Sequence, residues 1–166
     1  LACKYCNTRK SNKTTSENKN DYLWPDENNT ELAYTYAGGI PRVNSPILLE
    51  LDPSGNIAQK AEKLFELVEL GNIPAPKDKD RRFKQRIETY ASARISLKKW
   101  KKLKETEYKE DSKELIAEIV RSKGFFSVWL EVFKDEPEIK ICCSIFFREQ
   151  KQDSLMQMEM LGRFFM

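Results

Sequence analysis

Residues 80–104 read DRRFKQRIETYASARISLKKWKKLK, and this run decides the fold class of the chain. Its apolar residues recur at spacings that place them roughly on one side of a helix: Phe83, Ile87, Tyr90, Leu97 and Trp100. No proline or glycine interrupts the run. We therefore predict one long basic helix from about Asp80 to Lys104.

Shorter helical patterns lie on both sides of this run. Residues 57–70 keep an apolar spacing of three to four, after a turn at residues 52–55 and before Gly71. Asp111 and Glu114 have the spacing of a capping box, which predicts a helix that Gly124 ends. Two further helices are expected, over residues 125–133 and from Pro137. The prediction is a mainly α protein with a helical body of four to five helices.

The first fifty residues are less regular. Residues 7–30 are polar and predict a surface loop around residues 22–26. Residues 31–36 alternate Leu, Tyr and Tyr on one face, which predicts a short strand closed by a turn at Gly38-Gly39 and Pro41. We expect a small first domain over residues 1–50 and a helical domain over residues 51–166.

Composition excludes several classes of protein. With 166 residues, 40% apolar and 33% charged, the chain has enough apolar surface for a core and does not have a disordered composition. No apolar run approaches the roughly 20 residues of a membrane span, and no secretory signal is visible. Four cysteines in two tight pairs, rather than a spaced disulfide framework, favour a reduced cytoplasmic location.

Positive charge is concentrated in one region. Between residues 77 and 104 twelve Lys or Arg face only three acidic residues, an excess that favours a polyanion partner such as DNA. The candidate phosphate contacts in this region include Arg81, Arg82, Lys98 and Lys99. The alternative is that these charges form an ordinary solvated helix face.

Cys3 and Cys6 have the C-x-x-C spacing of a zinc knuckle. Structural zinc needs four ligands, and the chain has no histidine and no second C-x-x-C. Cys142 and Cys143 are adjacent and so poorly placed to point at one ion. The sequence therefore predicts at most half of a structural Zn²⁺ site, with a buried thiol pair or coincidence as the alternative.

The stretch Cys3-Lys4-Tyr5-Cys6-Asn7-Thr8-Arg9-Lys10 resembles the second half of the motif of Cys-braced HNH nucleases of the ββα-metal type. That resemblance implies that Asn7 is a catalytic residue and a ligand of Mg²⁺ or a similar divalent ion. It also implies DNA contacts from Lys10 with Arg9, in a basic cluster that includes Lys13. Ser11 departs from the glycine frequent in the family, and the alternative for Asn7 is a turn-forming role.

The order of later segments strengthens this resemblance over roughly residues 1–140. The segments are Asp21-Tyr22-Leu23-Trp24-Pro25-Asp26, the strand, Lys60-Ala61-Glu62, Asp80-Arg81-Arg82-Phe83 and Gly124-Phe125-Phe126-Ser127-Val128-Trp129. The resemblance implies a bacterial DNA endonuclease of a defence or restriction-like kind. Some related HNH proteins pair with an ATPase in anti-phage systems, so an ATPase is an implied partner.

The ends of the chain carry two further expectations. The chain starts with Leu1, without the histidine and first C-x-x-C of the family, so we expect the N-terminal half to be missing and this polypeptide to be catalytically inactive. Residues 141–166 depart from the family, and a one-base shift near the codon of Lys140 restores a family-like ending. We therefore hypothesise an out-of-frame tail, with a divergent amphipathic tail as the alternative.

Two other functions remain open from the sequence. One is a non-catalytic helical module that binds DNA or docks on a partner. The other is a helical subunit of a defence complex that places a nuclease on its ATPase.

Overall fold

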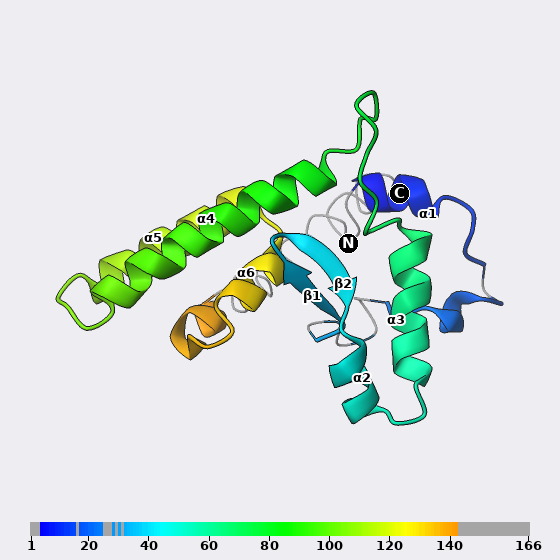
Figure 1. Ribbon diagram of the computed structural model, residues 1–166, viewed down its shortest axis with the longest axis horizontal. Helices are drawn as coiled ribbons and strands as arrows, with labels where there is room; N and C mark the ends of the chain where they lie inside the picture. Colours follow the sequence, from blue (N-terminus) through cyan, green and yellow to red (C-terminus); the bar gives the residue numbers. More distant parts are fainter. Residues whose placement is uncertain (1–3, 16, 25–27, 29, 31, 143–166) are drawn as a thin grey trace, which may run out of the picture. The chain divides into compact units, whose positions relative to one another are not determined.

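The computed structural model describes residues 4–15, 17–24, 28, 30 and 32–142 (Figure 1). The chain divides into two compact units, Leu1–Glu88 and Thr89–Met166. Most of the described chain is helical, with one two-stranded antiparallel sheet, so the prediction of a mainly α fold with a short hairpin is confirmed. Among the described residues, no helix has both the length and the apolar character needed to cross a lipid bilayer.

The first unit contains a hairpin and several helices. In chain order it has α1 (Lys4–Lys10), the short 3₁₀ helix η1 (Lys19–Asp21), β1 (Tyr34–Ala37), β2 (Ile40–Val43), α2 (Ser45–Leu51), α3 (Asn56–Leu67) and the start of α4 (Arg82–Leu103). The expected boundary at residue 50 differs from this division, because α3 packs against both α2 and β2. Buried Leu23, Leu48 and Ala61 share one apolar cluster that joins these segments.

The hairpin turns at two glycines. Gly38 and Gly39 have φ values of +61° and +85°, which fits the two-residue turns that match the twist of paired strands. Tyr36 pairs with Pro41, so Pro41 lies within β2 rather than closing the turn as expected. Its missing N–H is tolerated because a two-stranded sheet consists of edge strands.

Helix α3 follows the predicted turn. Asp52 accepts hydrogen bonds from the backbone N–H of Ser54 and Ile57, at 3.1 and 2.9 Å, and thereby holds the start of the helix. Ala58, Ala61, Leu64 and Leu67 are buried at a spacing of three, as an amphipathic helix requires. The helix ends at Leu67, three residues before the predicted end, and Glu69 just beyond it has a positive φ of 50°.

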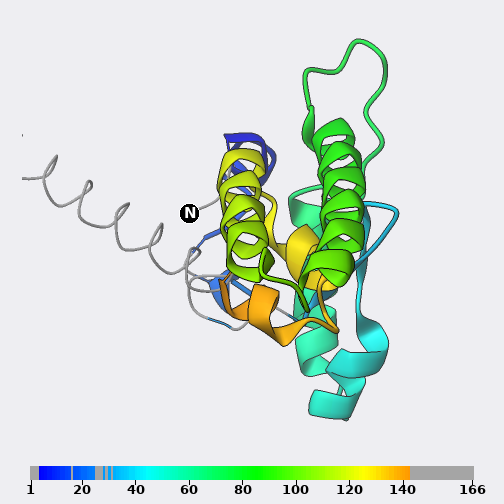
Figure 2. The same ribbon diagram turned by 90° about the vertical axis from the view of Figure 1, so that its left-hand side faces the viewer.

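The second unit is helical throughout its described part. Helix α4 continues to Leu103 and lies beside α5 (Lys109–Lys123), followed by α6 (Phe126–Val132) and helical residues 137–142 (Figures 1 and 2). Its core contains the fully buried side chains of Trp100, Val120, Trp129, Phe133 and Ile139. Trp100, which the sequence placed on the apolar side of the long helix, is therefore part of this core.

Three local predictions need correction. Helix α5 begins at Lys109, and its N-terminal flanking residue Tyr108 makes no side-chain capping bond, so Asp111 lies in the first turn and caps nothing. Phe125 precedes α6 in a left-handed conformation instead of starting the helix. The expected loop over residues 7–30 contains most of α1 and all of η1, and its Leu23 is buried. The hypothesis of an out-of-frame tail concerns mainly residues 143–166, which lie outside the described residues.

Candidate functional site

The residues that the sequence nominated lie in two places, around α1 in the first unit and along α4. Cys6, Asn7, Arg9 and Lys10 all lie within α1, so the segment after the C-x-x-C is helical. Cys3 lies outside the described residues. The backbone of Asn7 belongs to α1, and its side chain lies outside the described part of the chain.

Cys6 is held by an arginine from α4. The Arg82 guanidinium donates a hydrogen bond from Nη1 to Cys6 Sγ at 3.1 Å, and the same nitrogen donates to the Val68 carbonyl oxygen at 2.9 Å. Cys6 also packs against the buried cluster of Leu64, Leu67 and Val68. These contacts fix the rotation of α1 against the end of α3.

Arg82 is not a surface contact for DNA. Its side chain is only 4% exposed and forms an ion pair with Asp80, at 2.7 Å between Nη2 and Oδ2. Burial disfavours the charged guanidinium, but the hydrogen bond to Asp80 and the charges of Cys6 and Asp80 outweigh burial and raise the pKa of Arg82. The predicted phosphate role of Arg82 is therefore wrong, because its N–H groups are engaged inside the first unit.

The basic residues of α1 are partly engaged as well. Arg9 forms ion pairs with Glu69 and Asp78, each at 3.2 Å. The ammonium of Lys10 lies over the ring of Trp24, 5.2 Å from its centroid, which is a cation–π contact. Lys13, just beyond the helix, is exposed. Lys10 and Lys13 thus keep charge toward solvent, whereas Arg9 serves mainly to join α1 to the end of α3.

Of the predicted metal ligands Cys3, Cys6 and Asn7, the structure describes the side chain of Cys6. Within the described residues there is no group of three or more His, Cys, Asp or Glu that could hold a metal ion. Cys6 is the one described thiol of the C-x-x-C, and its sulfur is bound by a guanidinium. The described residues by themselves therefore do not make up a zinc site or a divalent-metal site.

Helix α4 presents a stripe of unpaired positive charge in the second unit. Arg94, Lys98, Lys101 and Lys102 line one shallow hollow with Ile95 and Leu97. Positions separated by four, seven and eight residues share a helix face, so these four cations form a continuous basic stripe. Among the described residues none of Arg94, Lys98 and Lys102 makes an ion pair, while Lys101 contributes to the field at Glu136.

Two of the other predicted contacts lie away from this basic stripe. Lys99 lines a different hollow, between α4 and α5, and so is not on the same face as Lys98. Arg81 is exposed just before α4, in the first unit. The sequence therefore identified the basic helix but not which of its charges share a face.

Some relevant residues were missed. Asp80 was not identified as a helix cap, although an Asp two residues before a helix is a recognisable capping signal. Its Oδ1 accepts the Arg82 backbone N–H at 3.0 Å. Ile95 and Leu115, 60% and 52% exposed, lie on predicted helices but were not identified as exposed apolar residues. No sequence signal distinguishes them from the buried positions.

Comparisons with known proteins add no assignment. No protein-family model matches the chain, and neither the curated proteins nor the solved structures contain a match. The resemblance to HNH nucleases consequently stays a prediction that rests on the motifs quoted above.

Proposed function

We propose that this chain belongs to a metal-dependent HNH DNA endonuclease of a bacterial defence or restriction-like kind, and that its described residues bind the DNA backbone. The nuclease part of the proposal rests on the order Cys3, Cys6, Asn7, Lys10 and on the segments that follow it. The DNA-binding part rests on the basic stripe of Arg94, Lys98, Lys101 and Lys102.

The basic stripe is the observation that carries DNA binding. Arg94, Lys98 and Lys102 have no ion-pair partner among the described residues, and Lys101 acts only through space on Glu136. All four lie on one face of α4, where they can contact the phosphates of a DNA backbone. Each phosphate neutralised releases condensed counterions, so binding becomes more salt-dependent with each contact.

The chemistry of the proposed nuclease follows from the implied residue types. A bound divalent ion would polarise the scissile phosphate and stabilise the leaving oxygen. An Asn carbonyl oxygen at position 7 suits a hard cation, and a cationic side chain at Lys10 suits a phosphate. Water activation needs a base, and this polypeptide contains no histidine to provide it in the family manner.

Binding of duplex DNA at several salt concentrations tests the role of the basic stripe. Arg94→Ala and Lys102→Ala should each lower the slope of log K against log salt by about 0.9. Lys123→Ala is the matched control, because it removes an exposed positive charge from α5, outside the basic stripe. If all three variants lower this slope equally, DNA is attracted nonspecifically by net charge, and the result counts against this interface.

Cleavage by the complete gene product tests the nuclease proposal. We expect divalent-metal-dependent cutting of DNA that Asn7→Ala abolishes while DNA binding is retained. The 166-residue chain by itself should bind DNA without cutting it. Metal-dependent cleavage by this polypeptide would contradict that expectation, and a complete gene product that binds but never cuts would contradict the nuclease assignment.

The second candidate is a non-catalytic helical module that binds DNA or docks on a partner. The contact between Arg82 and Cys6 favours it, because it gives the thiol a structural role that needs no metal. The cleavage assay separates the two candidates. In either case we propose a cytoplasmic location, from the clustered cysteines, and an ATPase as the partner to test first, from the family resemblance.

A further inference from the structure

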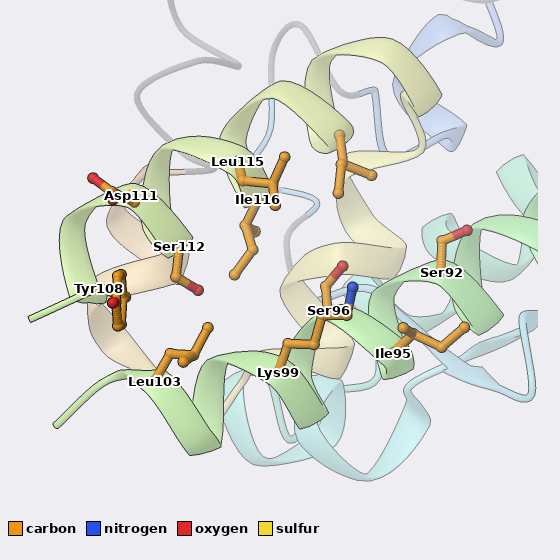
Figure 3. A pocket seen from close by; sticks show the side chains of 11 residues that line it. Ser92, Ile95, Ser96, Lys99, Leu103, Tyr108, Asp111, Ser112, Leu115 and Ile116 are labelled. Carbon is orange, nitrogen blue, oxygen red and sulfur yellow. The ribbon is translucent and has the colours of Figure 1, made fainter. Parts of the chain in front are cut away.

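An apolar groove runs between α4 and α5 in the second unit. Figure 3 shows its walls, with Ile95 and Leu103 on α4 and Leu115 and Ile116 on α5. Ile95 and Leu115 are 60% and 52% exposed, and Tyr108 at the end of the groove is 54% exposed. Large apolar side chains concentrated on one face at this exposure are typical of a surface that another protein covers.

Two serines also line the groove. Ser96 and Ser112 are only 6% and 7% exposed, and within the described residues neither hydroxyl makes a hydrogen bond. Both side chains are directed into the space between the two helices (Figure 3). Neither hydroxyl oxygen is a buried atom without a partner, so both keep access to solvent and can bond a polar group that enters the groove.

Charges at the groove are of both signs and are separated by helix. Lys99 lines it from α4 and Asp111 lines it from α5, and neither forms an ion pair among the described residues. From residue 94 to the end of α4 all charged residues are basic. Helix α5 has four acidic and four basic residues, and Asp111 is the acidic residue that lines the groove. The groove therefore has a basic wall on α4 and one carboxylate on its α5 wall.

We propose that this groove is the interface between two copies of the chain. A two-fold axis parallel to the helices places α4 of each copy on α5 of the other, so that the basic face of α4 does not meet its own copy. Lys99 then faces Asp111 of the second copy, and the reciprocal pair forms by symmetry, as an isologous contact requires. The alternative two-fold, which stacks α4 on α4, is disfavoured because it brings like charges together.

The apolar side chains fit the same arrangement. The groove offers both protruding side chains, Ile95 and Leu115, and the hollow between two helices that can receive them. A surface with both parts is self-complementary, and the resulting four-helix contact resembles the packing of helix bundles. The basic stripe of Arg94, Lys98, Lys101 and Lys102 lines a neighbouring hollow that shares Ile95 with the groove, and none of the four cations lines the groove itself.

Sedimentation equilibrium of the full 166-residue chain over a wide concentration range tests the proposal. We expect a reversible dimer, and Leu115→Lys should weaken it at least about a hundredfold by placing two charges in an apolar contact. The control is Leu49→Lys, since Leu49 is 47% exposed and lies on α2 in the first unit. Unchanged circular dichroism and thermal unfolding confirm that each variant folds.

Charge reversal tests the two-fold arrangement itself. Lys99→Asp and Asp111→Lys should each weaken the dimer about tenfold or more, because each creates two like-charge contacts, and the double variant should restore it to within about threefold. A chain that stays monomeric at all concentrations overturns the proposal and assigns the groove to a different partner. A dimer insensitive to Leu115→Lys, or one that the double variant fails to restore, also overturns it.

Discussion

Asp80 and Arg82 form a buried ion pair at the point where α4 begins, with 2.7 Å between Arg82 Nη2 and Asp80 Oδ2. The same carboxylate accepts the Arg82 backbone N–H, so Asp80 both starts the helix and neutralises the buried cation. Arg82 in turn bonds Cys6 and Val68. One side chain thus connects α1, the end of α3 and the start of α4.

Loss of the Asp80 carboxylate should be costly. Asp80→Asn leaves the Arg82 charge buried without a counter-ion, and breaking a buried pair in this way typically costs about 3–5 kcal/mol of unfolding free energy. Urea unfolding, monitored by circular dichroism, measures this loss of unfolding free energy. Lys84→Ala is the control, because it removes an exposed pair with Glu88 on the same helix, where a loss below about 0.5 kcal/mol is expected. Equal losses for the two variants would contradict the role assigned to Asp80.

Acid should weaken the second unit through Glu136. Burial raises the pKa of this carboxyl, but hydrogen bonds from Trp100 and Lys104, at 2.8 and 3.0 Å, outweigh burial and lower the pKa below its usual range. A carboxyl with a lowered folded-state pKa binds its proton more readily in the unfolded chain. Its contribution to stability is therefore present above about pH 4.3, the ordinary value for Glu, and is lost as pH falls through the lower folded-state pKa.

Replacement of this carboxylate tests the sign of the pH effect. Glu136→Gln should be less stable than the parent at neutral pH, and the difference should narrow as the solution becomes acidic. Thermal unfolding at a series of pH values gives the comparison. Glu105→Gln, at an exposed position without an ion pair among the described residues, should follow the parent at every pH. If the difference in stability between Glu136→Gln and the parent widens in acid, the predicted direction of the pH effect is wrong.

The two turn glycines should respond differently to the same substitution. An added Cβ at Gly39 would lie 2.9 Å from the Arg86 carbonyl oxygen and from Ile87 Cα, whereas at Gly38 nothing lies within 4 Å. Both positions have positive φ, so each substitution carries the left-handed cost of about 1–2 kcal/mol. Gly39→Ala should lose a further 1–3 kcal/mol, roughly, from the backbone clash. Urea unfolding of the two variants measures the difference, and equal losses would exclude this close approach.

Helices with a periodic apolar stripe were predictable from the sequence. The surroundings of individual charged residues were not. Residues 57–70 and 80–104 were expected to be helical, and α3 and α4 occupy 56–67 and 82–103, because an apolar stripe marks a helix wherever it lies. Helix α2 was missed, since seven residues with Pro46 and consecutive apolar side chains show no helical period. β2 was missed because Pro41 read as part of a turn.

The candidate site was predictable only as a region. A run of Lys and Arg identifies a basic helix, but burial of Arg82 depends on tertiary contacts with Val68 and Cys6, far apart in the chain. Exposure of Ile95 and Leu115 likewise depends on how α4 and α5 pack. Cations within the basic helix can therefore be buried or exposed, and so can its apolar residues. The periodicity of the sequence alone does not show which.

Zinc content tests whether Cys6 belongs to a metal site in this polypeptide. We expect the purified 166-residue chain to hold much less than one zinc per molecule, because the described residues offer no third ligand. Cys6→Ser should leave the zinc content unchanged and cost less than about 1 kcal/mol, since a hydroxyl can accept the Arg82 hydrogen bond. Elemental analysis with intact mass gives the answer. About one zinc per chain, lost in Cys6→Ser, would instead support the zinc half-site of the nuclease.

Adjacent lysines on α4 should separate DNA binding from self-association. Lys98 lies in the basic stripe, whereas Lys99 lines the groove that faces α5. Each substitution to alanine removes one charge from the same helix, so the two variants are matched in net charge and in position.

Lys98→Ala should lower the slope of log K against log salt for DNA binding by about 0.9 and leave the dimer intact. Lys99→Ala should weaken the dimer and leave the slope unchanged. DNA titrations below the concentration of dimerisation and sedimentation equilibrium above it give the two readouts, and identical behaviour of the two variants would mean that the faces of α4 do not have separate roles.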